Sequence, residues 1–494
     1  MSNGNLFETR SQLPPCAYTV LDYDDFMFGI GDGEEEQSAS YPSRGPCVID
    51  LSRNDVRSVE KYAFAWTKYL DVVLGDGRLP LSVDAYAFYG ARGMRRVVFQ
   101  NVPSLTLRPR FFTNTESVDR VEIRQTLMTT LDTFVFEGLK GVAEIVLDRV
   151  DVGNIRSFAF SGIQFRRQRG LELDSLKSGG RNAVQWNGGE ATPASSGGSI
   201  NVTSCQVGVL STDAFRDANL ERISISRTDV DRLEKHAFRG VSGLQSLCFD
   251  SCRLGSTIGA ERFSSLRGLS RLHLNGLIDT RVVDRFAFRG TTNIDQVLIH
   301  FRSDHVTLRT EAFAHVSDVG TLELRGNADQ QSSANELTID VGAFRNLVGV
   351  QRMRLADFRL PTLRRHSFSG MSRVGNLTIS DCSVSGIERE AFGDVASHVG
   401  AIGLLDLGAG NQLRCDCGTT SGGAVALQRE LAKRFSRYHA MCRVASGGHV
   451  SYVNVRQMAN DVCSGGSSQR TFPSISRVLS VVVAVAFFVL STYS

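Results

Sequence analysis

Residues 263–288 read FSSLRGLSRLHLNGLIDTRVVDRFAF, a segment that begins and ends on phenylalanines 25 positions apart. Phenylalanine recurs with nearly this spacing: the first four steps are 24 residues each, and all later steps except two are 23 to 25 residues. A period of this size predicts a stacked repeat, in which each unit buries its apolar face against its neighbours. The recurring residues are Phe64, Phe88, Phe112, Phe136, Phe160, Phe215, Phe238, Phe263, Phe288, Phe313, Phe344, Phe368 and Phe392.

Each phenylalanine is followed by apolar residues at positions +6, +9 and +11, which after Phe263 are Leu269, Leu272 and Leu274. The +9 and +11 pair predicts a short strand whose alternate side chains turn inward. The phenylalanine itself precedes a turn such as AFRG, residues 237–240, and is expected to fill the core behind the strand.

Two steps between phenylalanines are longer than the rest. The 55-residue step from Phe160 to Phe215 is interpreted as containing one further, degenerate repeat, with Ala191 in the phenylalanine position and Ile200 and Val202 as its strand. Polar stretches at about 177–198 and 327–335 predict loops that leave one face of the stack.

This pattern resembles the typical extracellular leucine-rich repeat of 24 residues, LxxLxLxxNxLxx…xxFxxLxx, over about residues 56–413. The resemblance implies an α/β solenoid, a curved horseshoe with a parallel sheet on its concave side and disulfide end caps. The inward slot that usually holds Asn or Cys is filled by Cys205, Cys252, Asn327 and Cys382, but elsewhere by Val102, Thr126, Val150, Leu277, Arg302 and Phe358. The usual asparagine ladder is therefore expected to be largely missing, with irregular curvature and some loose repeats.

Four segments follow from this pattern: an N-terminal segment at 1–50, about fourteen repeats at 51–413, a cysteine cap at 414–463 and a tail at 464–494. The formal net charge is +3, from 55 basic and 52 acidic residues. A near-neutral chain argues against nucleic acid as the main partner.

Cysteines are expected to close both ends of the solenoid. Cys415, Cys417, Cys442 and Cys463 have the spacing of the C-terminal cap of extracellular leucine-rich repeat proteins, and this resemblance implies disulfides Cys415–Cys442 and Cys417–Cys463. A four-cysteine zinc site is the alternative. Residues 424–435 fit a cap helix, and Cys16 and Cys47, which flank an acidic segment, are expected to pair at the N-terminal end.

The C-terminal tail matches a glycolipid (GPI) attachment signal. Small residues at 464–468 precede a polar spacer at 469–477 and the apolar run VLSVVVAVAFFVL at 478–490, with Gly466, or else Ser464, as the attachment residue. The run is shorter than the ~20 residues of a bilayer-spanning helix, although a short transmembrane helix is the alternative. Residues 1–20 show no apolar core of a secretory signal, so we expect either an incomplete start or a cytosolic protein with a post-translationally inserted tail, and favour the former.

The strand positions at +8, +10 and +12 are expected to build one continuous open face. Counted over the full set, this face carries eight arginines and five acids, and arginine suits carboxylate and sulfate groups. Two glycosylation sequons, at Asn201 and Asn376, fall on the same strands and would block part of the face. The predicted ligand-binding residues are Arg96, Arg120, Glu122, Arg124, Arg222, Arg271, His273, Glu323, Arg325, Arg352 and Arg354, with Glu144, Asp148 and Asp250 beside them.

No catalytic, metal-ligating or cofactor-binding residue is predicted. The nine histidines form no metal-ligating motif, no nucleophile motif accompanies them, and His300 and His305 near Asp304 are expected in an exposed turn. The predicted function is therefore non-enzymatic recognition or adhesion on the extracellular side of the plasma membrane, with a protein or glycan partner, as in chaoptin-like or slit-like repeat proteins. The alternatives are a matrix-associated glycan-binding protein and a cytosolic tail-anchored scaffold.

Overall fold

The computed structural model describes residues 5–6, 47–68, 70–166, 198–327, 335–393, 402–408, 410–413, 415, 424–435, 437–446 and 449–462. The predictions for the disulfides Cys16–Cys47 and Cys417–Cys463, and for the tail at 464–494, lie outside the described residues.

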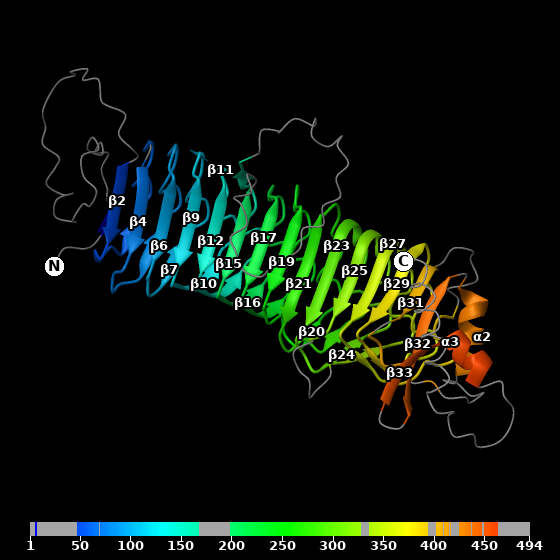
Figure 1. The fold of residues 1–494 in the computed structure, drawn as a ribbon. Coiled ribbons are helices and arrows are strands. Elements are labelled where there is room, and N and C mark those ends of the chain that lie inside the picture. Colours follow the sequence, from blue (N-terminus) through cyan, green and yellow to red (C-terminus); the bar gives the residue numbers. More distant parts are fainter. Residues whose placement is uncertain are drawn as a thin grey trace, which may run out of the picture.

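One sixteen-stranded sheet runs from end to end of the described chain (Figure 1). Its strands follow sequence order and pair in parallel up to β32, and β33 completes the sheet as an antiparallel edge. The strands are β2 Cys47–Ser52, β4 Leu70–Gly75, β6 Arg96–Gln100, β9 Arg120–Arg124, β12 Glu144–Asp148, β15 Ser199–Thr203, β17 Arg222–Ser226, β19 Ser246–Asp250, β21 Arg271–Leu277, β23 Thr292–Phe301, β25 Ser317–Arg325, β27 Val348–Ala356, β29 Val374–Ser380, β31 Ile402–Leu407, β32 Tyr438–Ser446 and β33 His449–Asn454.

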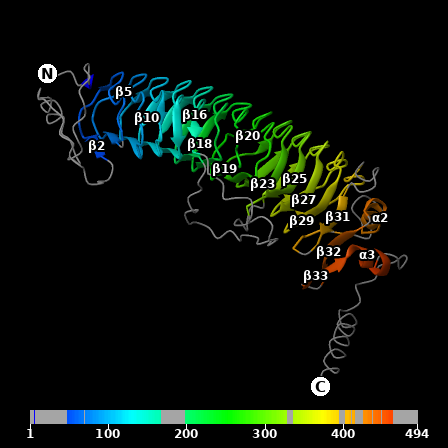
Figure 2. The same ribbon diagram turned by 90° about the horizontal axis from the view of Figure 1, so that it is seen from above.

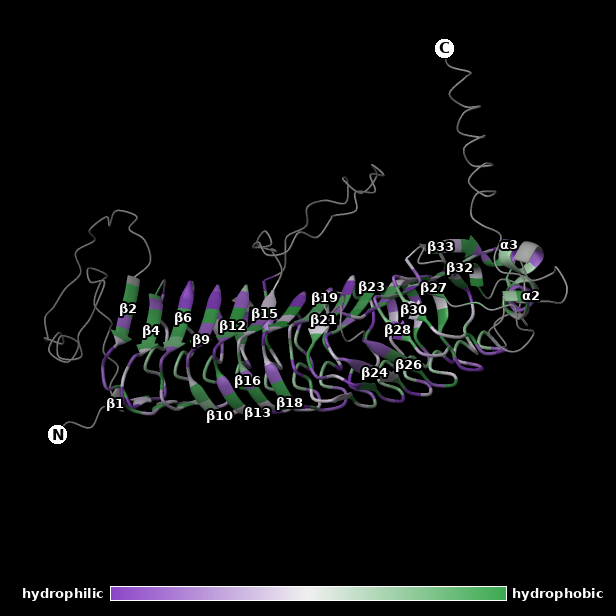
Figure 3. Cartoon of the chain, turned by 60° about the horizontal axis from the view of Figure 1, so that its bottom comes forward, coloured by the Kyte–Doolittle hydropathy of each residue, from purple (hydrophilic) through white to green (hydrophobic). Residues whose placement is uncertain are grey.

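The opposite side of each coil is made of turns and short strands, so that the molecule has two β layers with the core between them (Figure 3). Viewed from above, the stack forms a shallow arc (Figure 2). The short strands are β1 Asn5–Leu6, β3 Ser58–Val59, β5 Leu81–Val83, β7 Leu105–Leu107, β8 Thr115–Glu116, β10 Leu127–Leu131, β11 Leu139–Val142, β13 Asp151–Ile155, β14 Gln164–Phe165, β16 Gln206–Leu210, β18 Asp229–Leu233, β20 Thr257–Ile258, β22 Val282–Val283, β24 His305–Leu308, β26 Glu336–Ile339, β28 Arg359–Leu360 and β30 Ser383–Val384. The predicted leucine-rich-repeat solenoid with its parallel sheet is confirmed.

The recurring phenylalanines form a continuous stack of rings through the core. Phe263 and Phe288 lie 5.6 Å apart between ring centroids, and Phe288 and Phe313 lie 5.0 Å apart with planes only 1° from parallel. Ring pairs at such distances add to the free energy of burial. The stack ends on Phe435, whose ring meets Phe392 edge-on at 5.4 Å and covers the last coil.

The interpretation of Ala191 as the start of an extra repeat is wrong. Phe160 stacks directly on Phe215, at 4.8 Å and 4°, and β15 is the single strand between β12 and β17 in the large sheet. The 55-residue step is therefore one coil with a long insertion before its strand. The strand itself was assigned correctly, since Ile200 and Val202 are buried.

A backbone ladder runs along the corner that precedes each ring. The residue two positions before the phenylalanine has a positive φ in every coil, for example +61° at Glu261 and +63° at Phe286. The amide of Glu261 donates to the carbonyl of Phe286 at 3.1 Å, and the amide of Phe286 donates to that of Glu311 at 3.0 Å. Because non-glycine residues seldom adopt this conformation, the contacts of the stack must hold it in place.

Side chains in the inward slot after the strands bond to the backbone in more coils than the few Asn and Cys residues of the slot predicted. The thiol of Cys252 donates to the carbonyls of Ile225 and Asp250, both at 3.3 Å, and so ties its own turn to the preceding coil. Thr126, Thr228, Cys205, Cys382 and Asn411 make comparable side-chain to backbone bonds. The described coils are regular: in the large sheet, the pairing of their strands breaks register at one point, between Leu274 and Leu277. The predicted loose repeats are therefore not seen among the described coils.

Apolar side chains fill the slot where polar ones are missing. Leu277, Phe301 and Phe358 are buried there, and the last two rings lie 6.4 Å apart. Phe301 holds the position that the sequence pattern gave to Arg302, whose side chain is exposed. The pattern failed here by one residue, since β21 and β23 are out of register at this place.

The C-terminal end contains the predicted disulfide between Cys415 and Cys442, with 5.6 Å between their Cα atoms. Helix α2, Ala424–Arg434, falls where a cap helix was predicted, and α3, Val455–Gln457, and a π-helical turn, Met458–Val462, follow it. In the described part of the chain, no helix is long and apolar enough to span a membrane.

Truncating one ring of the stack should destabilise the protein strongly. Phe288→Ala removes a fully buried ring and leaves a cavity between two coils, with an expected cost of about 3–5 kcal/mol. Phe286→Ala is the matched control, because that half-buried ring lies outside the stack, beside Arg285 and Arg289. The free energies of unfolding can be compared in urea by circular dichroism, and equal losses for the two variants would contradict the stacking argument.

Candidate ligand-binding face

The open face of the large sheet is set by the strand alternation. In β21 the side chains of Leu272 and Leu274 are fully buried, so that Arg271, His273 and Asn275 point to the other side. All eleven predicted binding residues lie on this face, on β6, β9, β17, β21, β25 and β27. They are not equivalent, however, because their ion pairs divide them into an N-terminal cluster, a centre and a C-terminal cluster.

The N-terminal cluster is built around a buried carboxylate. Glu122 is only 1% exposed and lies in register between Val98 and Val146, which are also buried. Its oxygens meet the guanidinium nitrogens of Arg96 at 3.4 Å, Arg120 at 3.1 Å and Arg124 at 2.5 Å. A carboxylate in such an apolar row requires these partners, since an unpaired buried charge is very costly.

Glu144 extends the same cluster. It lies 3.1 Å from the Nε of Arg120 and accepts a hydrogen bond from the amide of Asn201. Each arginine of the cluster is thereby held by an acid of the same face, and we interpret the group as structural. Binding a ligand with one of these guanidinium groups would break an existing ion pair with Glu122 or Glu144.

The C-terminal cluster is also internally paired. Arg325 meets Asp357 at 2.9 Å and Glu323 at 3.9 Å, while Arg354 lies 3.7 Å from both Glu323 and Asp381. Arg354 also donates from Nε to the hydroxyl of Ser380 at 3.0 Å. Such partly exposed pairs contribute little stability individually, but they neutralise the charges of this end of the face.

The centre of the face, from β15 to β23, differs because its arginines have no acidic partner among the described residues. Arg222 and Arg271 lie at the same register position on either side of Ser246, which is nearly buried. Two strand spacings of ~4.8 Å place their Cα atoms about 10 Å apart. Arg352, further along the face, is also without an ion pair in the described structure.

Hydrogen bonds connect the central strands. His273 shares a hydrogen bond of 3.0 Å with Gln296, and His300 shares one of 3.0 Å with the side chain of Asn275. Asn275 in turn donates to Asp250 at 2.6 Å. These hydrogen bonds fix the side chains of neighbouring strands relative to one another, so that amide and imidazole groups line the open face.

The surroundings of His273 and His300 lower the pKa of both imidazoles and so favour the neutral form. Burial lowers the pKa of His273, Arg271 lowers it further, and the hydrogen bond to Gln296 opposes the shift. Burial likewise lowers the pKa of His300, with Arg325 and Arg302 acting in the same direction and Asp357 opposing them. The prediction of an exposed turn for His300 is wrong, because the residue lies half-buried in β23, whereas His305 is exposed in β24.

The sequon asparagines lie on the open face, as their spacing predicted. Asn201 is half-buried in β15, and its amide is bonded to Glu144, whereas Asn376 is exposed in β29 beside Arg352. A glycan on Asn201 would border the centre, and one on Asn376 would cover the surroundings of Arg352.

The sequence pattern missed acids at the two ends of the face. Asp71, in β4, is buried and accepts from the backbone amides of Arg95 and Arg96 at 2.9 and 3.1 Å. It was missed because Val72 and Leu74 are the inward residues of this strand, so that its register differs by one from the +8 rule. Asp50 and Asp406 also lie on this face, so the excess of arginine read from the sequence disappears over the whole sheet.

An exposed aromatic cluster near the first coils was also missed. Trp66 is 60% and Tyr62 50% exposed, and the ring of Tyr89 meets them edge-on at 5.2 and 5.8 Å. The amino group of Lys61 lies 4.8 Å from the centre of the Tyr62 ring. The spacing of Tyr62, Trp66 and Tyr89 from Phe64 and Phe88 could have shown that these rings belong to the outer corners.

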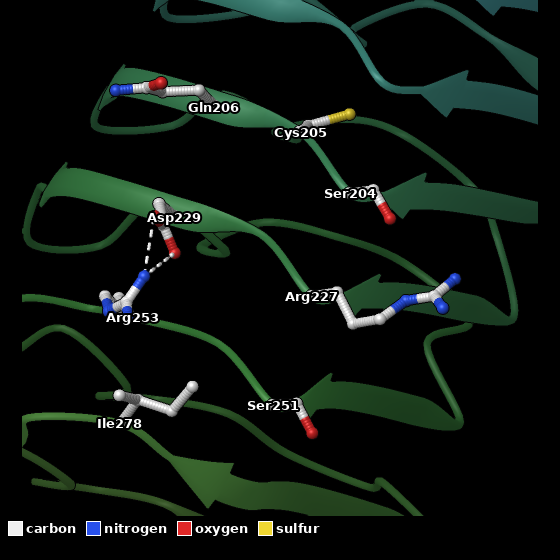
Figure 4. Close-up of a pocket in the computed structure, with 8 residues that line it drawn as sticks. All are labelled: Ser204, Cys205, Gln206, Arg227, Asp229, Ser251, Arg253 and Ile278. Carbon is white, nitrogen blue, oxygen red and sulfur yellow. Dashed lines mark hydrogen bonds and ion pairs between the residues drawn. The ribbon is translucent and has the colours of Figure 1, made fainter.

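A shallow hollow of about 460 Å³ lies where β15, β17 and β19 end (Figure 4). Arg253 occupies it through pairs with Asp229 at 3.1 Å and Asp279 at 3.3 Å, and the Arg227 side chain extends away from that pair. Burial raises the pKa of the Cys205 thiol in its wall to about 11, so the group stays protonated. The wall consists of Ser204, Cys205, Gln206, Arg227, Asp229, Ser251, Arg253 and Ile278.

The architecture and the face define a non-globular repeat scaffold that displays one extended polar surface. Comparison with known families finds the BspA type leucine rich repeat region in six copies, over residues 49–169 and 208–334. The chain belongs to this family of leucine-rich-repeat proteins. No curated protein matches the chain.

Among solved structures, the chain is similar to one titled as the crystal structure of a TLR13–ssRNA13 complex, with 13% identity and a TM-score of 0.29. The match covers 79% of this chain and 63% of that one, so the chain spans less than two thirds of its length.

Removing the buried carboxylate should cost more than removing one of its partners. Glu122→Ala leaves three guanidinium groups facing one another, and we expect a loss of about 3–5 kcal/mol. Arg96→Ala should cost about 1 kcal/mol or less, because Arg96 is exposed and two other arginines remain at Glu122. Urea unfolding measures both values, and a Glu122→Ala variant as stable as the wild type would refute the structural interpretation of the cluster.

The central histidines should make the fold less stable in mild acid. A histidine whose pKa is lowered on folding binds its proton more readily in the unfolded chain, so stability falls as pH drops below about 6.5. Replacing both by glutamine, His273→Gln with His300→Gln, should reduce the loss of unfolding free energy between pH 7.5 and 5.5. Identical losses in the variant and the wild type would show that these two groups do not contribute.

Proposed function

We propose that this protein is a non-enzymatic recognition scaffold that binds a protein or glycan partner on the centre of its open face. The observation that carries the proposal is the contrast along that face. Apart from Arg352, the predicted binding arginines at both ends are paired with acids, whereas Arg222 and Arg271 have no acidic partner among the described residues. Unpaired guanidinium groups on a rigid sheet are available to a partner without the loss of an existing ion pair.

Display at the cell surface is part of the proposal. The disulfide Cys415–Cys442 is of a kind that forms and persists in oxidising compartments, which supports a secreted or extracellular setting. The tail sequence favours a GPI anchor at Gly466 or Ser464, with a short transmembrane helix as the alternative. The near-neutral charge of the chain favours protein or glycan over nucleic acid.

Two other functions remain as alternatives to adhesion. A matrix-associated glycan-binding protein would use the same face, and a cytosolic tail-anchored scaffold would keep its cysteines reduced. Treating intact cells that express the chain behind a secretion signal with a GPI-cleaving phospholipase separates the cytosolic scaffold from the surface-displayed forms. Release of the protein supports the anchored form, retention at the surface indicates a transmembrane tail, and absence from the surface overturns the extracellular assignment.

The site on the face can be tested by placing a glycan on it. Ser224→Asn creates the sequon Asn-Ile-Ser on β17, two residues after Arg222, and His305→Asn creates Asn-Val-Thr on the outer strand β24 as a matched control. The probes are an array of secreted proteins and an array of neutral and acidic glycans. We expect the glycosylated Ser224→Asn protein to lose at least about 90% of wild-type binding. Equal losses in both variants would place the site elsewhere.

A further inference from the structure

Two of the three open-face arginines that have no acidic partner among the described residues lie at the centre of the face, on β17 and β21. Between β15 and β23 the face carries the guanidinium groups of Arg222 and Arg271, which have no acidic partner among the described residues. The acids on these strands are Asp250, whose carboxylate accepts from Asn275, and the exposed Asp295 of β23. On either side of this region the predicted binding arginines are paired with acids, apart from Arg352, which lies on β27 beside the sequon residue Asn376. A ligand with anionic groups is therefore attracted to the centre rather than to the ends.

The same region offers no apolar anchor for a protein partner. Its open positions hold serine, threonine, asparagine, glutamine, cysteine and histidine, with Leu298 half-buried among them. The large hydrophobic side chains that are exposed in the described structure all lie elsewhere, at Tyr62, Trp66, Leu127, Val341, Val450 and Tyr452. Protein interfaces usually derive most of their affinity from buried aromatic and apolar anchors, so this surface suits a hydroxyl-rich ligand better.

The spacing of the two arginines adds a geometric requirement. Ser246 lies between them with a small side chain that is nearly flush with the sheet, and about 10 Å separates the Cα atoms of its neighbours. A guanidinium fork binds a carboxylate or sulfate through two parallel hydrogen bonds. An extended chain with repeated anionic groups can engage both forks while its hydroxyl groups meet Ser224, Gln296 and His273.

From these observations, we infer that the ligand of the central face is an acidic polysaccharide, whose sulfate or carboxylate groups are bound by Arg222 and Arg271. The inference rests on the proposed function and specifies its ligand class. It excludes the paired end clusters from the site, since their guanidinium groups would have to leave Glu122, Glu144 or Glu323 to bind.

The test uses the full chain, two labelled probes and two double variants of equal charge. The probes are a heparin oligosaccharide, which carries sulfate and carboxylate, and a hyaluronan oligosaccharide, which carries carboxylate alone. The central variant is Arg222→Ala with Arg271→Ala, and the control is Arg96→Ala with Arg325→Ala on the same face. We expect the central variant to weaken binding of at least one probe about tenfold or more, and the control less than about threefold.

Further measurements separate the possible outcomes. Arg222→Lys with Arg271→Lys should bind with intermediate affinity, because it keeps the charges and loses the forks. Loss of heparin binding alone identifies sulfate as the recognised group, and loss of both identifies carboxylate. Equal weakening by both alanine variants would mean non-specific attraction and overturn the inference. Failure of both glycans to bind, while a secreted protein on the array still binds the face, would overturn the ligand class and leave the proposed function intact.

Discussion

Every coil of this protein can bury its apolar side only against the next coil, and the column of phenylalanine rings is where that constraint acts. The rings of Phe160 and Phe215 touch although 55 positions separate them in the chain. The insertion between them is tolerated because contact between coils, rather than the length of the connection, determines the stack. The strained corners at Glu261 and Phe286 persist for the same reason, since the packed coils on either side fix their backbone.

The stack also determines where function can lie. It aligns fourteen strands in parallel from β2 to β31, with one break in register between β21 and β23, and strand alternation then turns one row of side chains in each strand away from the core. Nothing in this arrangement requires that row to bind a ligand. Part of this row of side chains forms ion pairs within the protein. The clearest case is the carboxylate of Glu122, which lies between two valines and whose buried charge is compensated by three arginines. Function is therefore assigned to the part of the face that the fold leaves unpaired.

The sequence predicted the fold well where a position depends on its neighbours in the chain. Leu272 and Leu274 were assigned inward and Arg271 and His273 outward, and the structure agrees. The disulfide Cys415–Cys442 followed from its resemblance to known caps and is present. Predictions failed where the repeat is offset by one residue. Phe301, and not Arg302, fills the inward slot of its coil, and Asp71, and not Val72, lies on the open face of β4. Periodicity alone cannot show such offsets, because one residue changes the face of a strand.

By itself, the sequence determined the repeat, the two faces of each strand and the residue types on the open face, because these depend on local spacing and on the burial of apolar side chains. Only the tertiary structure decided which charges are neutralised. Arg120 and Arg222 are each the first residue of their strand on the open face, yet one meets Glu122 and Glu144 while the other lies beside serines. Glu122 follows Arg120 on the same strand, but Glu144 and the serines beside Arg222 come from neighbouring strands more than 20 positions away in the chain. Only the register of neighbouring coils brings those side chains together.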